Sequence, residues 1–392
     1  MKQKYVRKLK EEKPVLAICY DFDKTLTPTD MQAQGYIQSL QRDVVSFWEE
    51  SNKLARDNDM DQNLAYMYLM KEKARGKLLF TKRTLEEYGE KVVLYPGVEG
   101  WFERIREYGR NRNVIVEHYI ISSGLKEMIE ATSVARKGAF EKIYASSFFY
   151  NEHGEAQWPA QVVNYTNKTQ FLFRIEKGVL DVNDDGVNEY FAPEDIRVPF
   201  RNMIYIGDSD TDVPCMKVVD SYGGYSIGIY DEITKNKAKV HKMMKDGRIK
   251  YYTESDYTEG SELDSLVKAI IDRTATNEIL ESKHCNNKKM VTDEESQQDE
   301  AAKEKAALLV SLENSSSFAK THEIINSLQL CKDWSEENKE SLYGIALKNS
   351  QVKYILTDKD VKLFYLSLLE KEEVLSENAK KVKVLLAKKQ KQ

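Results

Sequence analysis

Two aspartates separated by one residue follow a short apolar stretch near the amino terminus. Residues 14–19 are continuously apolar, which predicts a buried strand, and Asp21 and Asp23 come directly after it. Side chains two residues apart in an extended segment point the same way, so both carboxylates can face one cleft. Carboxylates held this close repel each other unless a cation lies beside them, and Mg²⁺ prefers oxygen ligands. The pair predicts a magnesium site rather than the alternative, a solvated turn after an edge strand.

Two further polar groups follow predicted strands. Ser122, Ser123 and Gly124 end a buried strand predicted over residues 114–122, and a helix is expected from residue 125. Hydroxyls and backbone N–H groups at a helix N-terminus favour an anion site, although an ordinary helix cap needs the same residues. Asp208 and Asp212 follow a strand predicted over residues 202–206. Ligands bind at the carboxyl ends of strands in open α/β sheets, so these groups are expected to share one site.

The order of the remaining elements indicates how the site is positioned. Further strands are predicted over residues 140–149, 161–164 and 224–229, with helices between them. Strands that alternate with helices favour a doubly wound parallel α/β sheet. Residues 43–55, 63–74 and 84–93 have apolar residues at helical spacing, which predicts a helical cap inserted between the first and second strands. Within it, Trp48 and Tyr66 could line the cap over a substrate, but helical core packing is the favoured interpretation of each.

The chain is 392 residues long, which favours several domains. A helix over residues 262–273 is expected to close the catalytic domain, and a C-terminal all-α domain is predicted, with Tyr354 and Tyr365 in its core. The predicted domains are a catalytic core over residues 1–29 and 94–273, the cap over residues 30–93, a linker or exposed helix over residues 274–317, and the helical domain over residues 318–392.

Composition limits the partners. The formal net charge is −5, so binding to nucleic acid is not expected. The four cysteines form no CxxC pair, and no long uncharged apolar segment predicts a membrane span, so we expect a cytoplasmic protein. The basic amino terminus, residues 1–13, is interpreted as a solvated arm.

The motifs taken together resemble those of the haloacid dehalogenase-like superfamily. Asp21-Phe-Asp23-Lys-Thr25, Ser122, Lys168 and Gly207-Asp208 with Asp212 occur in that family's order over roughly residues 14–273. The helical insertion and Tyr95-Pro96-Gly97 resemble a phosphoserine-phosphatase-like enzyme with a helical C1-type cap. The resemblance implies a HAD-like Rossmannoid core and a Mg²⁺-dependent phosphatase that acts on a small phosphorylated metabolite.

The resemblance also implies a role for each motif residue. Asp21 is the nucleophile that forms an aspartyl-phosphate, and Asp23 is the general acid and base. Mg²⁺ is bound by Asp21, the backbone carbonyl of Asp23, and Asp208, with Asp212 in support. Ser122 and Lys168 bind the phosphoryl oxygens, and the N–H groups of Ser123 and Gly124 are further donors. Lys168 is preferred over three neighbouring lysines, Lys137, Lys142 and Lys177, because it opens a predicted helix after a short strand.

Two alternatives stay open. Asp23 at its position favours a phosphatase over the family's dehalogenases and ATPases, but a phosphomutase or phosphotransferase can use the same pair of aspartates. The C-terminal helical domain can instead carry the main role, through a protein partner or self-association.

Overall fold

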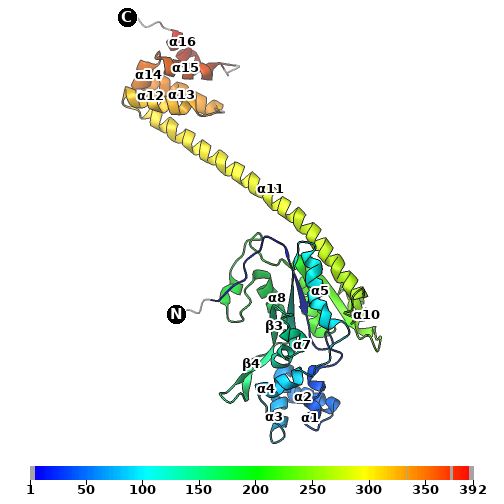
Figure 1. Ribbon diagram of the computed structural model, residues 1–392. Helices are drawn as coiled ribbons and strands as arrows, with labels where there is room; N and C mark the ends of the chain where they lie inside the picture. Colours follow the sequence, from blue (N-terminus) through cyan, green and yellow to red (C-terminus); the bar gives the residue numbers. More distant parts are fainter. Residues whose placement is uncertain (1–4, 333, 371–373, 388–392) are drawn as a thin grey trace. The chain divides into compact units, whose positions relative to one another are not determined.

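The structure is a computed structural model that describes residues 5–332, 334–370 and 374–387. It divides into two compact units, Met1–Ser282 and Lys283–Gln392. The first unit holds the β-sheet and the helical insertion, and the second is helical (Figure 1). The fold class predicted from the sequence is confirmed: a mostly parallel α/β sheet with an inserted group of helices and a C-terminal helical region. The domain boundaries given above stay a prediction.

The described residues of the first unit form one seven-stranded sheet in the order β4-β3-β2-β1-β5-β6-β7. The strands are β1 (Val15–Tyr20), β2 (Ile115–Leu125), β3 (Lys142–Tyr150), β4 (Ala156–Gln161), β5 (Met203–Gly207), β6 (Tyr225–Tyr230) and β7 (Tyr251–Glu254). All neighbours pair in parallel except β4, which is antiparallel to β3. Strands β2, β1 and β5 are therefore adjacent at the centre, and their carboxyl ends meet at one edge.

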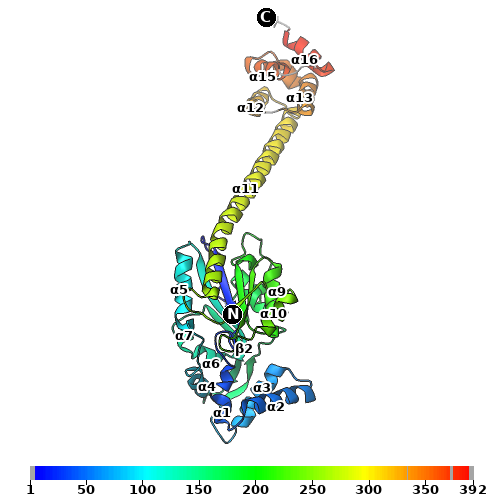
Figure 2. The same cartoon turned by 90° about the vertical axis from the view of Figure 1, so that its right-hand side faces the viewer.

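Each face of the sheet is covered by helices, which explains why the central strands are apolar throughout. Alternate residues of β1 point to opposite faces, and both sets are buried. On one face pack α5 (Val98–Arg110) and the start of α11 (Glu262–Glu313). On the other pack α8 (Lys168–Lys177), α9 (Val213–Ser221) and α10 (Ala238–Lys245). Figure 2 shows α5 on one side of the strands and α9 with α10 on the other. Two short helices, α6 (Lys126–Glu130) and α7 (Ser133–Arg136), follow β2.

The insertion after β1 is helical, as its apolar spacing predicts. Its helices are α1 (Tyr36–Ser39), α2 (Val44–Asp57), α3 (Gln62–Ala74) and α4 (Lys82–Gly89). The two longer helices begin at aspartate caps: Asp43 accepts from the N–H of Ser46, and Asp61 accepts from the N–H groups of Asn63 and Leu64. Trp48 packs edge-to-face on Tyr66, with ring centroids 5.7 Å apart.

Three local predictions for the first unit are wrong. The short strand expected over residues 161–164 lies earlier, as β4, and residues 162–167 form a loop. The helix expected to end at residue 273 continues to Glu313 within α11. The amino-terminal arm is not fully solvated, because Arg7 pairs with Asp184 at 3.0 Å and Lys8 with Glu117 at 2.6 Å. The acidic partners of the arm are far away in the sequence, so composition alone gave no sign of this contact.

The second unit has its own apolar core. After the end of α11, its helices are α12 (Phe318–Gln329), α13 (Glu336–Lys348), α14 (Ser350–Ile355), α15 (Lys359–Leu369) and α16 (Glu377–Ala387). Tyr365 is buried in this core, as predicted, together with Leu342 and Phe364. Tyr354 was expected there but is 77% exposed and stacks on Phe318. Among the described residues of the chain, no helix has the length and apolar character needed to cross a bilayer.

Candidate active site

The site begins where β1 ends. The backbone N–H of Asp21 donates to the carbonyl of Ile206 on β5 at 3.0 Å, so the residue still follows the sheet. Its Oδ1 accepts from the N–H of Phe22 at 2.8 Å, which fixes the direction of the carboxylate. The chain then turns sharply at Lys24, whose φ of 56° lies in the left-handed region. These contacts hold Asp21 at the carboxyl edge of the sheet with only 7% of the residue exposed.

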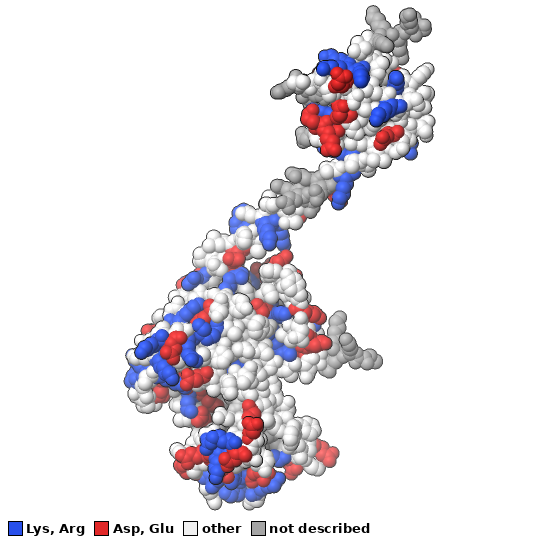
Figure 3. All heavy atoms as spheres, turned by 180° about the vertical axis from the view of Figure 1, so that it is seen from behind, with Lys and Arg blue, Asp and Glu red and all other residues white. Residues whose placement is uncertain are grey.

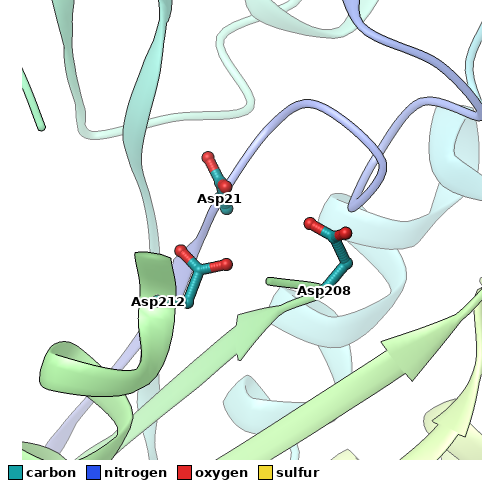
Figure 4. Close-up of side chains that lie close together, drawn as sticks. All are labelled: Asp21, Asp208 and Asp212. Carbon is teal, nitrogen blue, oxygen red and sulfur yellow. The ribbon is translucent and has the colours of Figure 1, made fainter. Parts of the chain in front are cut away.

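Two aspartates that follow β5 complete a group of three carboxylates. Asp21, Asp208 and Asp212 each place an oxygen within 4.8 Å of the others. Figure 4 shows the three side chains around one shared space, Asp21 from the end of β1 and the other two from the segment after β5. Gly207 makes this approach possible, because a Cβ atom there would lie 2.7 Å from the Cγ of Asp212. A side chain at position 207 would push Asp212 out of the group.

Lys168 is the buried cation beside these carboxylates. Its Nζ lies 2.8 Å from Oδ1 of Asp212 and 3.2 Å from Oδ2 of Asp21, and the side chain is fully buried. The loop before α8 fixes its position, since the N–H of Lys168 donates to the carbonyl of Asn164 at 3.0 Å. Asn164 in turn donates to the helix-capping Asp61 of the insertion at 2.7 Å. The insertion therefore helps to hold the loop that carries Lys168.

The crowding of negative charge shows in the pKa values. Burial raises the pKa of Asp21 to about 7, and the neighbouring charge of Asp212 adds to the rise although Lys168 opposes it. Burial likewise raises the pKa of Asp208 to about 6, against the effect of Lys239. Burial alone would lower the pKa of Lys168, but the carboxylates of Asp21 and Asp212 outweigh it and raise that pKa. Two lysines, Lys168 and Lys239, do not neutralise three carboxylates. Carboxylate oxygens are the ligands that Mg²⁺ prefers, so the residues fit that ion.

Asp23 lies apart from this group. Its Oδ1 accepts from the N–H of Met31 at 2.7 Å. Its Oδ2 would lie 2.9 Å from a Cβ atom at residue 124, so Gly124 leaves room for the carboxyl group. Burial and the nearby charge of Asp30 hold the pKa of Asp23 well above its usual range. The carboxyl group of Asp23 is therefore set up to hold a proton.

Ser122, Ser123 and Gly124 lie within β2 and not in a turn before a helix, which corrects the expected local structure. The strand continues to Leu125, and the pairing with β3 shifts between Ser122 and Leu125. The N–H of Gly124 donates to Oγ of Ser122 at 3.1 Å. The helix that follows is five residues long and begins at Lys126, so any anion contact must come from the irregular strand end itself.

Two residues that reach the site were not predicted as part of it. The hydroxyl of Tyr66 on α3 donates to the carbonyl of Ser123 at 2.7 Å, although core packing was the favoured interpretation of this residue. Lys239 at the start of α10 places its Nζ 3.3 Å from Oδ2 of Asp208. Helical spacing cannot tell which face of a cap helix turns toward the sheet. Lys239 is one of many lysines in its segment, so neither residue carried a recognisable signal.

The comparison with known families agrees with this architecture. A family model of haloacid dehalogenase-like hydrolases matches residues 18–217, which is 200 of 392 residues. This chain therefore belongs to the haloacid dehalogenase-like hydrolases.

Individual relatives are more distant. An uncharacterized protein of Borreliella burgdorferi is 25% identical over 282 residues, which cover 65% of this chain and 96% of the relative. Among solved structures, a HAD family hydrolase from Salmonella enterica matches with a TM-score of 0.45 and 16% identity, over 66% of this chain and 72% of that one. A probable phosphoserine phosphatase from Vibrio cholerae matches with a TM-score of 0.44 and 12% identity, over 68% and 67%.

Proposed function

We propose that this protein is a Mg²⁺-dependent phosphatase that hydrolyses a small phosphomonoester through an aspartyl-phosphate on Asp21. The observation that carries the proposal is the group Asp21, Asp208 and Asp212 with the buried Lys168, next to the separate carboxyl group of Asp23. A nucleophile, a cation site and an acid are the parts that two-step phosphoryl transfer requires.

In the first step, a carboxylate oxygen of Asp21 attacks phosphorus and the bond to the leaving oxygen breaks. The hydrogen bond from Phe22 and the ion pair with Lys168 hold the carboxylate in one orientation, so little ordering is left for the transition state. Asp23 gives its proton to the leaving oxygen, which its raised pKa permits. In the second step, the oxygen of a water molecule attacks phosphorus while Asp23 takes a proton from that water. The bond between phosphorus and the Asp21 oxygen breaks, which releases phosphate and restores the carboxylate.

The phosphoryl oxygens need positive charge and hydrogen-bond donors. We assign these roles to Lys168, to the hydroxyl of Ser122, and to the backbone N–H groups of Ser123 and Gly124. The proposed ligands of Mg²⁺ are Asp21, Asp208, the backbone carbonyl of Asp23, and Asp212 in support. Bound there, the ion would neutralise charge that develops on the phosphoryl group. Tyr66 on the insertion lies over Ser123 and would help to exclude water from the site.

The first test is turnover with and without the metal. The full chain should release phosphate from p-nitrophenyl phosphate and from members of a panel of phosphorylated metabolites when Mg²⁺ is present. Excess EDTA should stop the reaction, and added Mg²⁺ should restore it, because the ion would neutralise the charge that develops on the phosphoryl group. Undiminished turnover in EDTA, or no turnover of any phosphomonoester, would contradict the proposal.

A phosphotransferase or phosphomutase is the alternative, because Asp23 could activate a sugar or alcohol hydroxyl as readily as water. The same assay decides between them if glycerol and sugars are added and the products are separated. Free phosphate as the only product supports the phosphatase.

The proposed compartment is the cytoplasm, since the four cysteines are all free thiols.

The helical unit is proposed as an interaction module for a protein partner or a second copy of the chain. Its buried residues form a core of their own, separate from the two clusters on the sheet. Because α11 runs through residue 275, the informative truncation is after Ser282, where the first compact unit ends. The truncated protein should stay folded and keep its turnover within about twofold, since the apolar clusters on both faces of the sheet contain no described residue beyond Ser282. An insoluble or inactive product would show that the catalytic unit needs the rest of the chain.

A further inference from the structure

A lysine at the rim of the carboxylate group has no place in the mechanism above. Lys239 lies in the first turn of α10, and its Nζ is 3.3 Å from Oδ2 of Asp208. The lysine side chain is 46% exposed, whereas that of Asp208 is 16% exposed. Lys239 therefore contacts the proposed metal ligand from the solvent side, whereas Lys168 is fully buried.

The segment around Lys239 is strongly basic in a chain whose net charge is −5. Between residues 235 and 250 there is one acidic residue, Asp246, against seven basic ones: Lys235, Lys237, Lys239, Lys242, Lys245, Arg248 and Lys250. Figure 3 shows Lys and Arg side chains gathered at the edge of the first unit where α10 lies. A local field of this sign attracts anions toward the rim of the site.

The neighbouring cations already have partners away from the metal ligands. Lys24 at the same rim pairs with Asp30 at 2.9 Å. Lys235 pairs with Glu254 at 2.6 Å, and the Nζ of Lys237 lies 4.9 Å from the centre of the Tyr230 ring. For Lys239, Asp208 is the one ion-pair partner found among the described residues. A divalent cation on Asp208 would take that partner away and would also repel the ammonium group. Lys239 would then be a positive group at the mouth of the site with no protein anion to bind.

We propose that Lys239 binds a second anionic group of the substrate. This inference rests on the proposed phosphatase function and narrows its substrate class. The substrate would be a phosphomonoester that carries another phosphate or a carboxylate a few bonds from the scissile group. The first phosphate would lie at Asp21 and Lys168, and the second anionic group would lie on the side of β6 and α10.

Binding of three phosphonates tests the assignment without turnover. Isothermal titration calorimetry with saturating Mg²⁺ would compare propylphosphonate, propane-1,3-bisphosphonate and 4-phosphonobutyrate on the full chain, Lys239→Met and Lys242→Met. Lys242 is the matched control, an exposed lysine one turn further along α10. Wild type should bind a probe with two anionic groups more tightly than propylphosphonate. Lys239→Met should lose about tenfold in affinity for that probe, as for a contact to a charged group, and less than about twofold for propylphosphonate.

A second readout is the binding of Mg²⁺ alone. Lys239→Met should bind the ion as tightly as wild type or more tightly, because the ammonium group no longer competes for Asp208. Lys242→Met should leave every measurement unchanged. Comparing the bisphosphonate with the phosphonocarboxylate shows which anionic group is preferred.

Each contrary result has a distinct meaning. Equal losses for all three probes would place Lys239 at the scissile phosphate and overturn the inference. Unchanged affinity for both probes with two anionic groups would also overturn it. If Mg²⁺ binds to wild type but no phosphonate does, the proposed phosphatase function is wrong, and the inference falls with it.

Discussion

Asp21→Asn should lower the turnover of a phosphomonoester by at least about 10⁴-fold, because the neutral amide is a poor nucleophile toward phosphorus. The fold should survive, since asparagine has nearly the same shape and its side-chain oxygen can still accept from the N–H of Phe22. In the absence of Mg²⁺ the variant should even be as stable as wild type or more stable. Burial and the charge of Asp212 raise the pKa of Asp21 to about 7, so the ionised side chain is unfavourable in the metal-free protein.

The opposite signs of the two effects make the test specific. Steady-state turnover and urea unfolding should be measured on the same preparations, both with and without Mg²⁺. Asp210→Asn is the matched control, because Asp210 is an exposed aspartate in the segment that joins Asp208 to Asp212. The control should keep wild-type activity. Turnover of Asp21→Asn close to that of wild type would show that another residue is the nucleophile.

The positions of the aspartates after β1 and β5 could be read from the sequence for a simple physical reason. Continuous apolar runs identify buried strands, and parallel strands place their carboxyl ends at one edge of the sheet. The grouping of Asp21 with Asp208 and Asp212 follows from that rule once β1 and β5 are neighbours. The order of the strands did not follow from periodicity.

Features that depend on contacts between distant segments could not be read in the same way. Arg7 and Lys8 looked like part of a solvated basic arm because their partners, Asp184 and Glu117, lie more than a hundred residues away. The contact of Tyr66 with Ser123 could not be predicted either. Whether an aromatic side chain of the cap packs in its core or reaches the site depends on which face of its helix turns toward the sheet. Helical periodicity gives the apolar face of a helix but not the surface that this face meets.

The irregular end of β2 was also beyond prediction from composition. A Ser-Ser-Gly sequence suits a helix cap, but the strand pairs with β3 again at Leu125, after an irregularity that begins at Ser122. Gly124 has a different use here, because its missing side chain leaves space for the carboxyl group of Asp23. A contact of this kind between two predicted motifs appears only when both are placed in three dimensions.

Lys168→Met should have the second large effect, on both stability and activity. The substitution leaves the buried carboxylates of Asp21 and Asp212 without their cation, and losing one partner of a buried ion pair costs about 3–5 kcal/mol in the free energy of unfolding. Turnover should fall by roughly 10²–10³-fold as well, the usual cost of removing one group that stabilises transition-state charge. Lys142→Met, a half-buried lysine at the other end of the parallel strands, should change either quantity only slightly.

The pH dependence separates this explanation from a simple packing defect. The pKa of Asp21 in the folded protein is about 7, above its usual value, so stability linked to the protonated form is lost as the pH rises through 7. Without Lys168 the pKa of Asp21 in the folded protein should be higher still, because Lys168 opposes the rise. The loss of stability should then be larger and should continue to a higher pH. Urea unfolding of Lys168→Met without Mg²⁺ should therefore show a deficit in the free energy of unfolding, relative to wild type, that is largest near pH 8 and shrinks toward pH 5.

Saturating Mg²⁺ should recover part of the deficit at pH 8, since the ion binds the same carboxylates. A deficit that is the same at every pH, with or without the ion, would mean that Lys168 contributes packing and not charge.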